Sequence, residues 1–359
     1  MADIRLKTLT PLWTGGVDGM ADRIHETGLL GSLRWWYEAI VRGLGGTACD
    51  PSTGTCRFDA GKFRRSAATD ECQRLHDAGL CDACQLFGAT GWRRRFRIAV
   101  VDDQTSPLWK VGQLLNIRPP GRNRGWFLPP GRMGEFILRL DGDKESVARV
   151  LALLRFVERW GSLGAKPQLG YGVVEMQNWD AIRDRLHNFS WRQEAQRWTR
   201  SAPGNSQQLP DLRQFGFFRY RFQPPNPAWW SRIGGFERVI TQVRPFATQT
   251  IPVAPALKNA WRFQRWQRAW GNDQLFWGRV ATDRVRGKVA LSWAYPQRDE
   301  WEVRGSAWLT GVKTEPVWQM LINAEIWNTT ICGTTPDVGT LKTVRPQTID
   351  ELLTFLERI

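Results

Sequence analysis

The sequence predicts an α+β fold with two ferredoxin-like (RRM-like, βαββαβ) domains in tandem. Two observations lead to this fold class. The chain has 359 residues, which is too long for one domain at about 150 residues each. The apolar residues of its first half follow strand and helix periods in the order strand, helix, strand, strand, helix, strand. We expect an N-terminal domain over 1–193, with a cysteine-containing insertion at about 47–90, and a C-terminal domain over 215–359.

Each element of the first domain has its own signal. Alternating residues over 3–9 predict the first strand, and apolar residues at helical spacing from Leu30 to Leu44 predict a helix that Gly45 and Gly46 end. The same criteria predict strands at 96–101 and 135–140, an amphipathic helix at 144–160 and a last strand at 171–176.

The second domain shows a similar pattern in a weaker form. A polar stretch at 194–214, which contains prolines and a glycine, predicts the linker between the domains. Beyond it we expect a second β-α-β-β-α unit, with a strand at 218–222, helices at 227–243 and 257–270, paired strands at 285–295 and 301–309, and helices at 317–327 and 349–356.

The composition points to a polyanionic partner. The chain has 50 Lys and Arg against 35 Asp and Glu, a net charge of +15, and this excess comes with 21 Trp and 17 Phe. Arginine binds phosphate through a planar fork and stacks on bases, as aromatic rings also do. We therefore expect a polyanion as the partner; a basic surface that only maintains solubility is the alternative.

The sequence predicts neither a membrane span nor secretion. The longest apolar helical stretch, 147–160, contains Arg149, Arg155 and Arg159, so it is too short and too charged to cross a bilayer. The first residues run into a strand pattern rather than into a basic and then apolar leader. We expect a cytoplasmic protein.

A run of arginines opens the second predicted strand. Residues 91–97 read GWRRRFR, and in an extended chain Arg93, Arg95 and Arg97 would share one face while Arg94 and Phe96 share the other. We interpret this run as a track for phosphates. An edge strand that charge protects against aggregation is the alternative.

A glycine-rich segment, 161–172 (GSLGAKPQLGYG), precedes the last strand of the first domain. Its glycines allow close approach of the backbone to a phosphate, and Lys166 supplies charge. The spacing differs from that of the Walker A loop, so nucleotide hydrolysis is not indicated. A tight turn that serves chain geometry alone is the alternative.

Five cysteines gather between the first helix and the arginine run, and two of them form a CxxC. In a cytoplasmic chain this pattern favours a structural zinc site over disulfides. Cys49 and His76 compete with Cys56 for one place, and a redox CxxC is the alternative. The ligands that we expect are Cys56, Cys72, Cys81 and Cys84.

Catalytic signatures are scarce. The chain has three histidines, and no GxSxG, HExxH or kinase signature accompanies them. His25 lies in the predicted turn before the first helix, near Asp18 and Asp22, where an acid–base role is conceivable. Polar turn residues of this kind are usually solvated, so we expect no catalytic residue.

Four segments together resemble the RAMP superfamily of CRISPR proteins. They are 10–16 (TPLWTGG), 26–36 (ETGLLGSLRWW), 84–88 (CQLFG) and 164–172 (GAKPQLGYG), and with the first strand they span residues 1–176. The LRWW helix, the segment 86–92 (LFGATGW) and the arginine run are most similar to the first RAMP subunit of the type III-B, or Cmr, effector complex.

That resemblance implies two ferredoxin-like domains and a place at the head of a ribonucleoprotein filament that acts in antiviral defence. There the chain would bind target RNA and the 3′ region of the guide RNA beside other RAMP subunits. The start of the first helix and the glycine-rich loop would face RNA. With the arginine run, the expected RNA-binding residues are Ser32, Arg34, Arg93, Arg94, Arg95, Arg97, Gly164, Lys166, Gly170 and Tyr171. Many members lack a CxxC here, so the zinc prediction rests on spacing alone.

Two alternatives remain open. Some RAMP proteins cut RNA, and the slicing members use an aspartate between the first strand and the first helix, where Asp18 and Asp22 lie in this sequence. A metal-dependent endoribonuclease is therefore the second hypothesis. The third is a free-standing zinc-containing RNA-binding protein that has no partner subunits.

Overall fold

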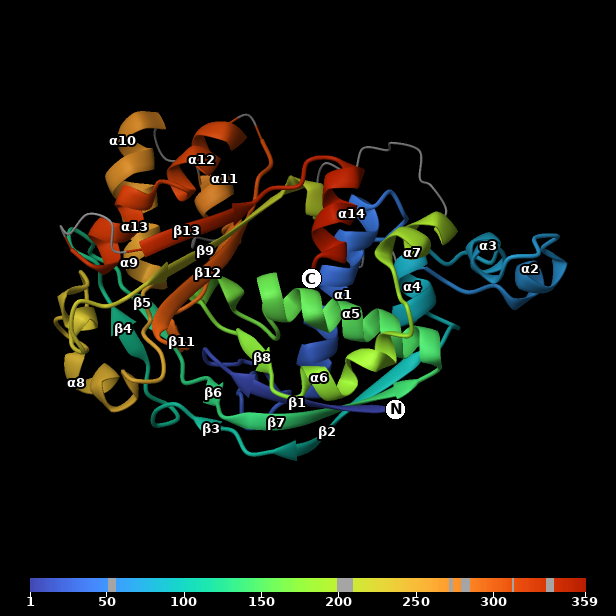
Figure 1. Cartoon of the computed structure of the whole chain (residues 1–359), viewed down its shortest axis with the longest axis horizontal. Helices are drawn as coiled ribbons and strands as arrows, with labels where there is room; N and C mark the ends of the chain where they lie inside the picture. Colours follow the sequence, from blue (N-terminus) through green and yellow to red (C-terminus); the bar gives the residue numbers. More distant parts are fainter. Residues whose placement is uncertain (51–55, 199–208, 271–273, 279–284, 312, 334–338) are drawn as a thin grey trace.

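The mixed α/β class is confirmed, since both large sheets are antiparallel and carry helices (Figure 1). The computed structural model describes residues 1–50, 56–198, 209–270, 274–278, 285–311, 313–333 and 339–359. Of the expected linker at 194–214, residues 199–208 lie outside the described residues. The domain boundary there stays a prediction.

The first sheet consists of β1 (Ala2–Thr8), β2 (Phe96–Asp103), β7 (Glu135–Gly142) and β8 (Val174–Met176). The strands lie in the order β2-β7-β1-β8, each antiparallel to its neighbours. Alternate residues of β1 are buried because α1 (Glu26–Gly43) and α5 (Lys144–Trp160) cover one face of the sheet (Figure 1). β8 begins later than expected, because Gly172 has a φ of +94° and belongs to the preceding loop.

Two irregular segments interrupt this first unit. Between α1 and β2 lie three short helices, α2 (Ala60–Arg65), α3 (Glu71–Asp77) and α4 (Asp82–Phe87). Between β2 and β7 lie two small antiparallel pairs, β3 (Ser106–Pro107) with β6 (Arg132–Met133) and β4 (Leu115–Ile117) with β5 (Trp126–Leu128). Strands of two or three residues are too short to show alternation, so the sequence analysis does not contain them.

The second sheet is built from β9 (Phe215–Phe222), β10 (Val289–Leu291), β12 (Glu300–Trp308) and β13 (Gly339–Val344), in the order β10-β12-β9-β13. A short strand, β11 (Tyr295–Gln297), also pairs with β12. β13 is missing from the sequence analysis, because its residues are largely exposed and lack a clear apolar face.

Two helices expected in the second half are interrupted. The stretch 227–243 contains a turn, η4 (Trp229–Arg232), and a short helix, α8 (Ile240–Val243), with Gly235 at a φ of +98° between them. The stretch 317–327 contains the end of α12 (Thr314–Leu321) and the start of α13 (Ala324–Ile331). Asn323 separates α12 from α13 because its side chain caps α13 by accepting from the N–H of Ile326.

The remaining helical elements are short, and several are turns of 3₁₀ type. They are η1 (Pro167–Leu169), α6 (Trp179–Ile182), η2 (Arg183–Leu186), α7 (Trp191–Arg197), η3 (Leu212–Gln214), η5 (Arg244–Phe246), α9 (Ala254–Asn259), η6 (Ala260–Trp266), α10 (Gln267–Trp270), α11 (Gln274–Trp277) and α14 (Ile349–Glu357). The expected helix at 257–270 is present as a continuous rod of α9, η6 and α10, in which η6 is a π-helix.

Each half of the chain contributes to the core of the other. The last helix, α14, places Leu352 and Leu356 in the first apolar core, beside α1 and α5 (Figure 1). In return the β4–β5 pair places Leu115, Ile117 and Leu128 in the second core. The two cores are therefore built from segments that are distant in sequence.

A buried arginine ties the two units together. Arg304 on β12 donates to the carbonyl oxygens of Glu158, Arg159 and Gly161, where α5 ends. Carbonyls at a helix end lack intrahelical partners and carry partial negative charge, so the guanidinium satisfies them. Among the described helices, none has the length and apolar character that a membrane crossing requires.

Candidate metal centre and arginine groove

Four cysteines converge beside the end of α1. The sulfur atoms of Cys49, Cys56, Cys81 and Cys84 all lie within 4.8 Å of one another, and Sγ of Cys49 is 3.5 Å from Sγ of Cys84. A tetrahedral zinc ion with bonds of about 2.3 Å holds its sulfurs about 3.8 Å apart. The cluster can therefore bind a metal ion.

Local structure aims these sulfurs at one point. Cys81 is the residue before α4 and Cys84 lies in its first turn, so the CxxC spacing brings both sulfurs to one end of the helix. The backbone N–H of Cys49 donates to Sγ of Cys81, and that of Cys81 donates to Sγ of Cys56, each over 3.3 Å. Hydrogen bonds from the thiols of Cys56, Cys81 and Cys84 lower the pKa of Cys49, which favours a thiolate, the form that binds metal.

The expected ligand Cys72 lies outside this cluster, and Cys49 takes its place. Cys72 is half-buried on α3, and its carbonyl oxygen accepts from Nε2 of Gln85 at 3.1 Å. This bond fixes α3 against α4, whereas the four cysteines of the cluster gather at the N-terminal end of α4. His76, the other alternative, is not in the cluster either. Sequence spacing could not choose between Cys49 and Cys72, because the choice depends on how α3 folds back.

Two polar side chains, those of Asp82 and Arg34, hold the cysteine segment to the domain. The carboxylate of Asp82 is buried and accepts from both the N–H and the hydroxyl of Thr47, each at 2.6 Å. Arg34 on α1 donates from Nη2 to Sγ of Cys84 at 3.2 Å, from Nη1 to the Gly88 carbonyl, and from Nε to Glu38. The sequence predicts that Arg34 contacts RNA. In the structure its guanidinium faces the cysteine cluster instead.

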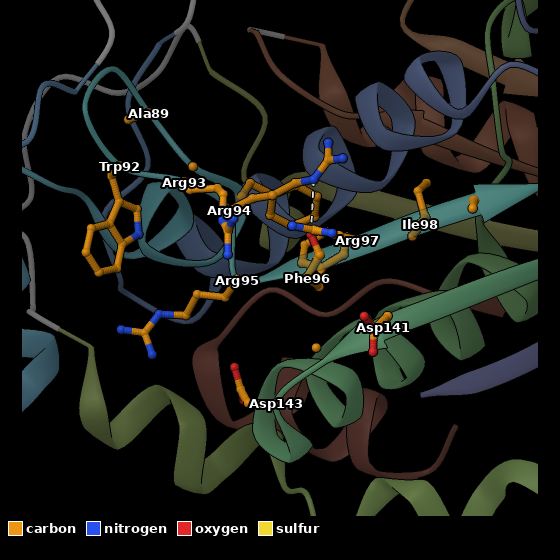
Figure 2. Close-up of a pocket in the computed structure, with 14 residues that line it drawn as sticks. Ala89, Trp92, Arg93, Arg94, Arg95, Phe96, Arg97, Ile98, Asp141 and Asp143 are labelled. Carbon is orange, nitrogen blue, oxygen red and sulfur yellow. Dashed lines mark hydrogen bonds between the residues drawn. The ribbon is translucent and has the colours of Figure 1, made fainter.

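A groove of about 930 Å³ begins where α4 ends (Figure 2). Phe87, the last residue of α4, lines it, and the chain then turns sharply at Gly88, whose φ is +87°. A Cβ at Gly88 would lie 2.8 Å from the N atom of Arg94, so only glycine fits this turn. Trp92 is anchored by a 3.0 Å hydrogen bond from Nε1 to the Gln85 carbonyl. One short helix thus carries both a cysteine ligand and a wall of the groove.

All four arginines of the run line this groove, but the strand face expected for Arg93, Arg95 and Arg97 is not formed, since only Arg97 lies in β2. Residues 93–95 precede β2, so strand alternation starts only at Phe96, which is buried, and Arg97, which is exposed. Arg94 donates to the Phe96 carbonyl.

Arg95 has partners of its own. Its guanidinium pairs with Glu71 at 2.7 Å and lies 5.4 Å from the centre of the Trp92 ring. Arg93 and Arg97 are the exposed pair. Asp141 and Asp143 also line the groove and partly offset its charge (Figure 2). The sequence analysis does not contain these two acids, because they come from the distant end of β7 and the start of α5.

The glycine-rich loop is hydrogen-bonded to α1 through Ser32. Its hydroxyl donates to the Leu29 carbonyl and accepts from the N–H of Gly164, each at 2.9 Å. Gly164 has a φ of +72°, and a Cβ there would lie 2.5 Å from the Trp13 carbonyl oxygen. Lys166 stands 4.5 Å above the Trp13 ring. This end of the loop is partly exposed.

The far end of the loop is buried, so two expected RNA contacts are corrected. Tyr171 is 1% exposed, and its hydroxyl donates to the Pro129 carbonyl at 2.5 Å. A Cβ on Gly170 would lie 2.3 Å from Cδ1 of Trp293. Both residues pack against the second core, which is a structural role that a single-chain pattern of glycines does not reveal.

A polar cluster occupies the turn between β1 and α1. Nε2 of His25 lies 2.6 Å from Oδ1 of Asp22, and this hydrogen bond lowers the pKa of Asp22. Oδ1 of Asp18 accepts from the N–H of Met20. A Cβ on Gly16 would lie 3.1 Å from the His25 ring and 3.4 Å from the Asp18 carboxylate, so both groups border the same glycine.

Comparison with known proteins gives a family match for the first half of the chain. Residues 5–175 match the RAMP superfamily. That segment contains the first sheet except residues 2–4 of β1 and the last residue of β8, together with the cysteine cluster and the arginine groove. No curated protein sequence matches the chain.

Among solved structures, the chain is similar to Cmr1 from Pyrococcus furiosus in its apo form, with 13% identity and a TM-score of 0.39, covering 86% of this chain and 88% of that one. It is also similar to a chain of the type III-B Cmr-β complex bound to cognate target RNA and AMPPnP, with 12% identity and a TM-score of 0.40, over 92% and 99% of the two chains. A third is from the Cmr-β complex bound to cognate target RNA, with 11% identity and a TM-score of 0.37, over 89% and 98%.

Proposed function

This chain belongs to the RAMP superfamily through its residues 5–175, and on that premise we propose that it is an RNA-binding subunit of a type III-B CRISPR effector complex. In this role it binds guide RNA near the 3′ end, together with target RNA, at the head of the filament and beside other RAMP subunits in the cytoplasm. The two sheets are interpreted as ferredoxin-like domains in tandem, because each has the strand order of a split βαβ unit. The three short helices are then an insertion in the first.

One observation carries the proposal: all four arginines of the run line a single groove. Four arginines and Trp92 line this groove of about 930 Å³, and Arg93 and Arg97 are exposed. One guanidinium group can bind two phosphate oxygens at once, and a base can stack on the face of an indole ring. Asp141 and Asp143 also line the groove and reduce its net positive charge.

The cysteine cluster is proposed to hold a structural zinc ion. Four sulfur ligands form a closed tetrahedral set with no open position, which suits a structural ion rather than a catalytic one. Zinc would link the end of α1, the loop after it and α4, and would thereby fix the wall of the groove. Metal binding in such sites contributes directly to folding.

The test is RNA affinity as a function of salt. We expect Arg93→Glu with Arg97→Glu to weaken binding of a short labelled single-stranded RNA and to make the log–log salt slope less negative by about 1.4, or about 0.7 for each lost phosphate contact. The matched control is Arg183→Glu with Arg185→Glu, two exposed arginines of η2. Equal binding by the two variants would remove the groove from the proposal.

A metal-dependent endoribonuclease is the second candidate, and the polar cluster before α1 favours it. Asp22 orients the His25 ring, and Asp18 lies beside the same glycine, so a base and a metal-binding carboxylate are close together. The experiment is incubation of end-labelled RNA with wild type, Asp18→Asn and His25→Gln in the presence of Mg²⁺. Cleavage by wild type that both variants lose supports the nuclease; intact RNA in all three supports binding alone.

A further inference from the structure

A second basic surface lies far from the arginine groove in sequence, where the β4–β5 pair meets the rod formed by α9, η6 and α10 (Figure 1). The turn between β4 and β5 reads RPPGRNRG and contains Arg118, Arg122 and Arg124. The rod contains Lys258, Arg262, Arg265 and Arg268. Neither 115–128 nor 254–270 contains an acidic residue.

The β4–β5 pair is fixed to the second half rather than free to move. Its apolar residues belong to the second core, as described above. A Cβ on Gly234 would lie 2.9 Å from Cδ of Pro120, and one on Gly235 would lie 2.8 Å from the backbone of Arg118. The backbones therefore touch, and the tip is held in a defined position.

The π-helix η6 places the ring of Phe263 against the tip of the β4–β5 pair. Trp261 and Trp266 are both buried although they are five residues apart, a spacing that in an α-helix would place them about 140° apart around the axis. The i→i+5 pattern of a π-helix brings them to one side. The other side of the rod carries Arg262 and Phe263, which are half-buried, and Arg265, which is exposed.

Two guanidinium groups lie against the ring of Phe263. Cζ of Arg122 is 3.5 Å from the ring centre and Cζ of Arg262 is 4.8 Å from it. The ring thereby joins the two segments through cation–π contacts. Lys258 is buried 5.4 Å from the Trp126 ring and donates to the Gln168 carbonyl, so the arginines rather than this lysine make up the exposed charge. Within the part of the chain that the structure describes, Glu325 approaches this surface, with its carboxylate 3.9 Å from Arg265 and both side chains mostly exposed.

We propose that this surface is a second binding site for single-stranded RNA, which rests on the proposed RNA-binding function and extends it. A base stacks on the outer face of the Arg122 guanidinium, which Phe263 holds flat, and neighbouring phosphates bind Arg124 and Arg265. An acidic protein segment would need only the charge. The planar arrangement of guanidinium on ring favours a nucleobase.

The experiment separates stacking from charge. Arg122→Lys keeps the charge and loses the planar group, so we expect about fivefold weaker binding of a short fluorescein-labelled single-stranded RNA, with the salt slope unchanged. Arg124→Gln with Arg265→Gln keeps the stack, and we expect the slope to become less negative by about 1.4. Arg183→Gln with Arg185→Gln is the matched control, and thermal melting verifies that each variant is folded.

The outcomes are distinct for the two proposals. Wild-type affinity and slope in both variants, while the Arg93 and Arg97 variant is weakened, would overturn this second site and leave the proposed function standing. No binding of RNA by the wild-type chain would overturn both. Crosslinks from 4-thiouridine RNA to peptides of 118–126 and 260–268 would support the second site. Loss of a co-purifying protein from the variants, with RNA binding intact, would assign the surface to protein contact instead.

Discussion

Nη2 of Arg34 donates a hydrogen bond to Sγ of Cys84 across 3.2 Å, which joins the middle of α1 to the CxxC turn. Donors to a metal-bound sulfur orient it and stabilise its negative charge. The same guanidinium pairs with the buried carboxylate of Glu38 at 2.7 Å. The arginine therefore connects the first helix, the cysteine cluster and, through the Gly88 carbonyl, the start of the groove.

Arg34→Met should weaken zinc retention about tenfold or more, the usual range for groups that support a metal ligand. The measurement is competition with a chromogenic chelator. Glu38→Gln is the companion variant, since it leaves the bond from Arg34 to Cys84 possible. Identical zinc release from wild type and from Arg34→Met would mean that this bond has no effect on the site.

Cys49→Ser should lose bound zinc, whereas Cys72→Ser should retain it. Loss of Cys49 removes one of the four clustered sulfurs, so we expect loss of bound zinc, measured by elemental analysis, and a lower melting temperature. Cys72 lies outside the cluster, and its replacement should leave the zinc content at that of wild type. Zinc loss from the Cys72 variant alone would show that the segment rearranges around the ion.

Tyr171→Phe should lower the free energy of unfolding by about 1 kcal/mol, because the carbonyl of Pro129 loses a buried donor. Urea denaturation measures this change. RNA affinity should be unchanged, since the ring is buried. A variant of normal stability that binds RNA more weakly would restore the role that the sequence analysis gave to Tyr171.

Lys258→Met should remove a pH dependence of stability. Burial, with a smaller effect of the Arg286 charge, lowers the pKa of Lys258 to about 7. Between that value and the ordinary pKa the unfolded chain binds more protons than the folded chain, so the wild-type stability contributed by this residue rises from pH 7 toward pH 10. The slope is at most about 1.4 kcal/mol per pH unit.

Urea titrations across that pH range should therefore give a flatter profile for Lys258→Met than for wild type. Lys342→Met, at an exposed position, serves as the control and should reproduce the wild-type profile. Parallel profiles for Lys258→Met and wild type would show that the buried lysine keeps its ordinary pKa.

Arg304→Met should destabilise the chain by about 3 kcal/mol, because it leaves the carbonyls at the end of α5 without a donor and removes a buried charge from beside Glu302. The measurement is equilibrium unfolding followed by tryptophan fluorescence. Arg298→Met, in the exposed β11–β12 turn, is the control. A loss similar to that of the control would mean that the two units are held together by apolar packing alone.

The sequence could predict the parts of the fold that have long, regular periods. The alternation of β1 and the helical spacing of α1 and α5 are local signals, and all three elements lie where they were expected. β13 and the β4–β5 pair lack such signals, because their pairing partners and not their own residues define them.

The candidate site divides along the same physical line. The CxxC pair is a local feature, and Cys81 and Cys84 are in the cluster. The choice of Cys49 over Cys72, the burial of Tyr171 and the contact of Arg34 with Cys84 depend on segments that are distant in sequence. The contact between Arg122 and Phe263 is of that kind too, since it joins the two halves of the chain.

Helix α14 is distant in sequence from the first sheet, yet Leu352 and Leu356 are part of the core built on β1 and α1. During synthesis the N-terminal half therefore keeps apolar surface uncovered until residues 349–357 have emerged from the ribosome. Domains that close on themselves can fold as they are made, and those that await a distant segment are exposed to chaperones and to aggregation. The first core is consequently complete only after Leu356 has been synthesised, and we expect chaperones that cover its apolar surface before that point to raise the yield of folded protein.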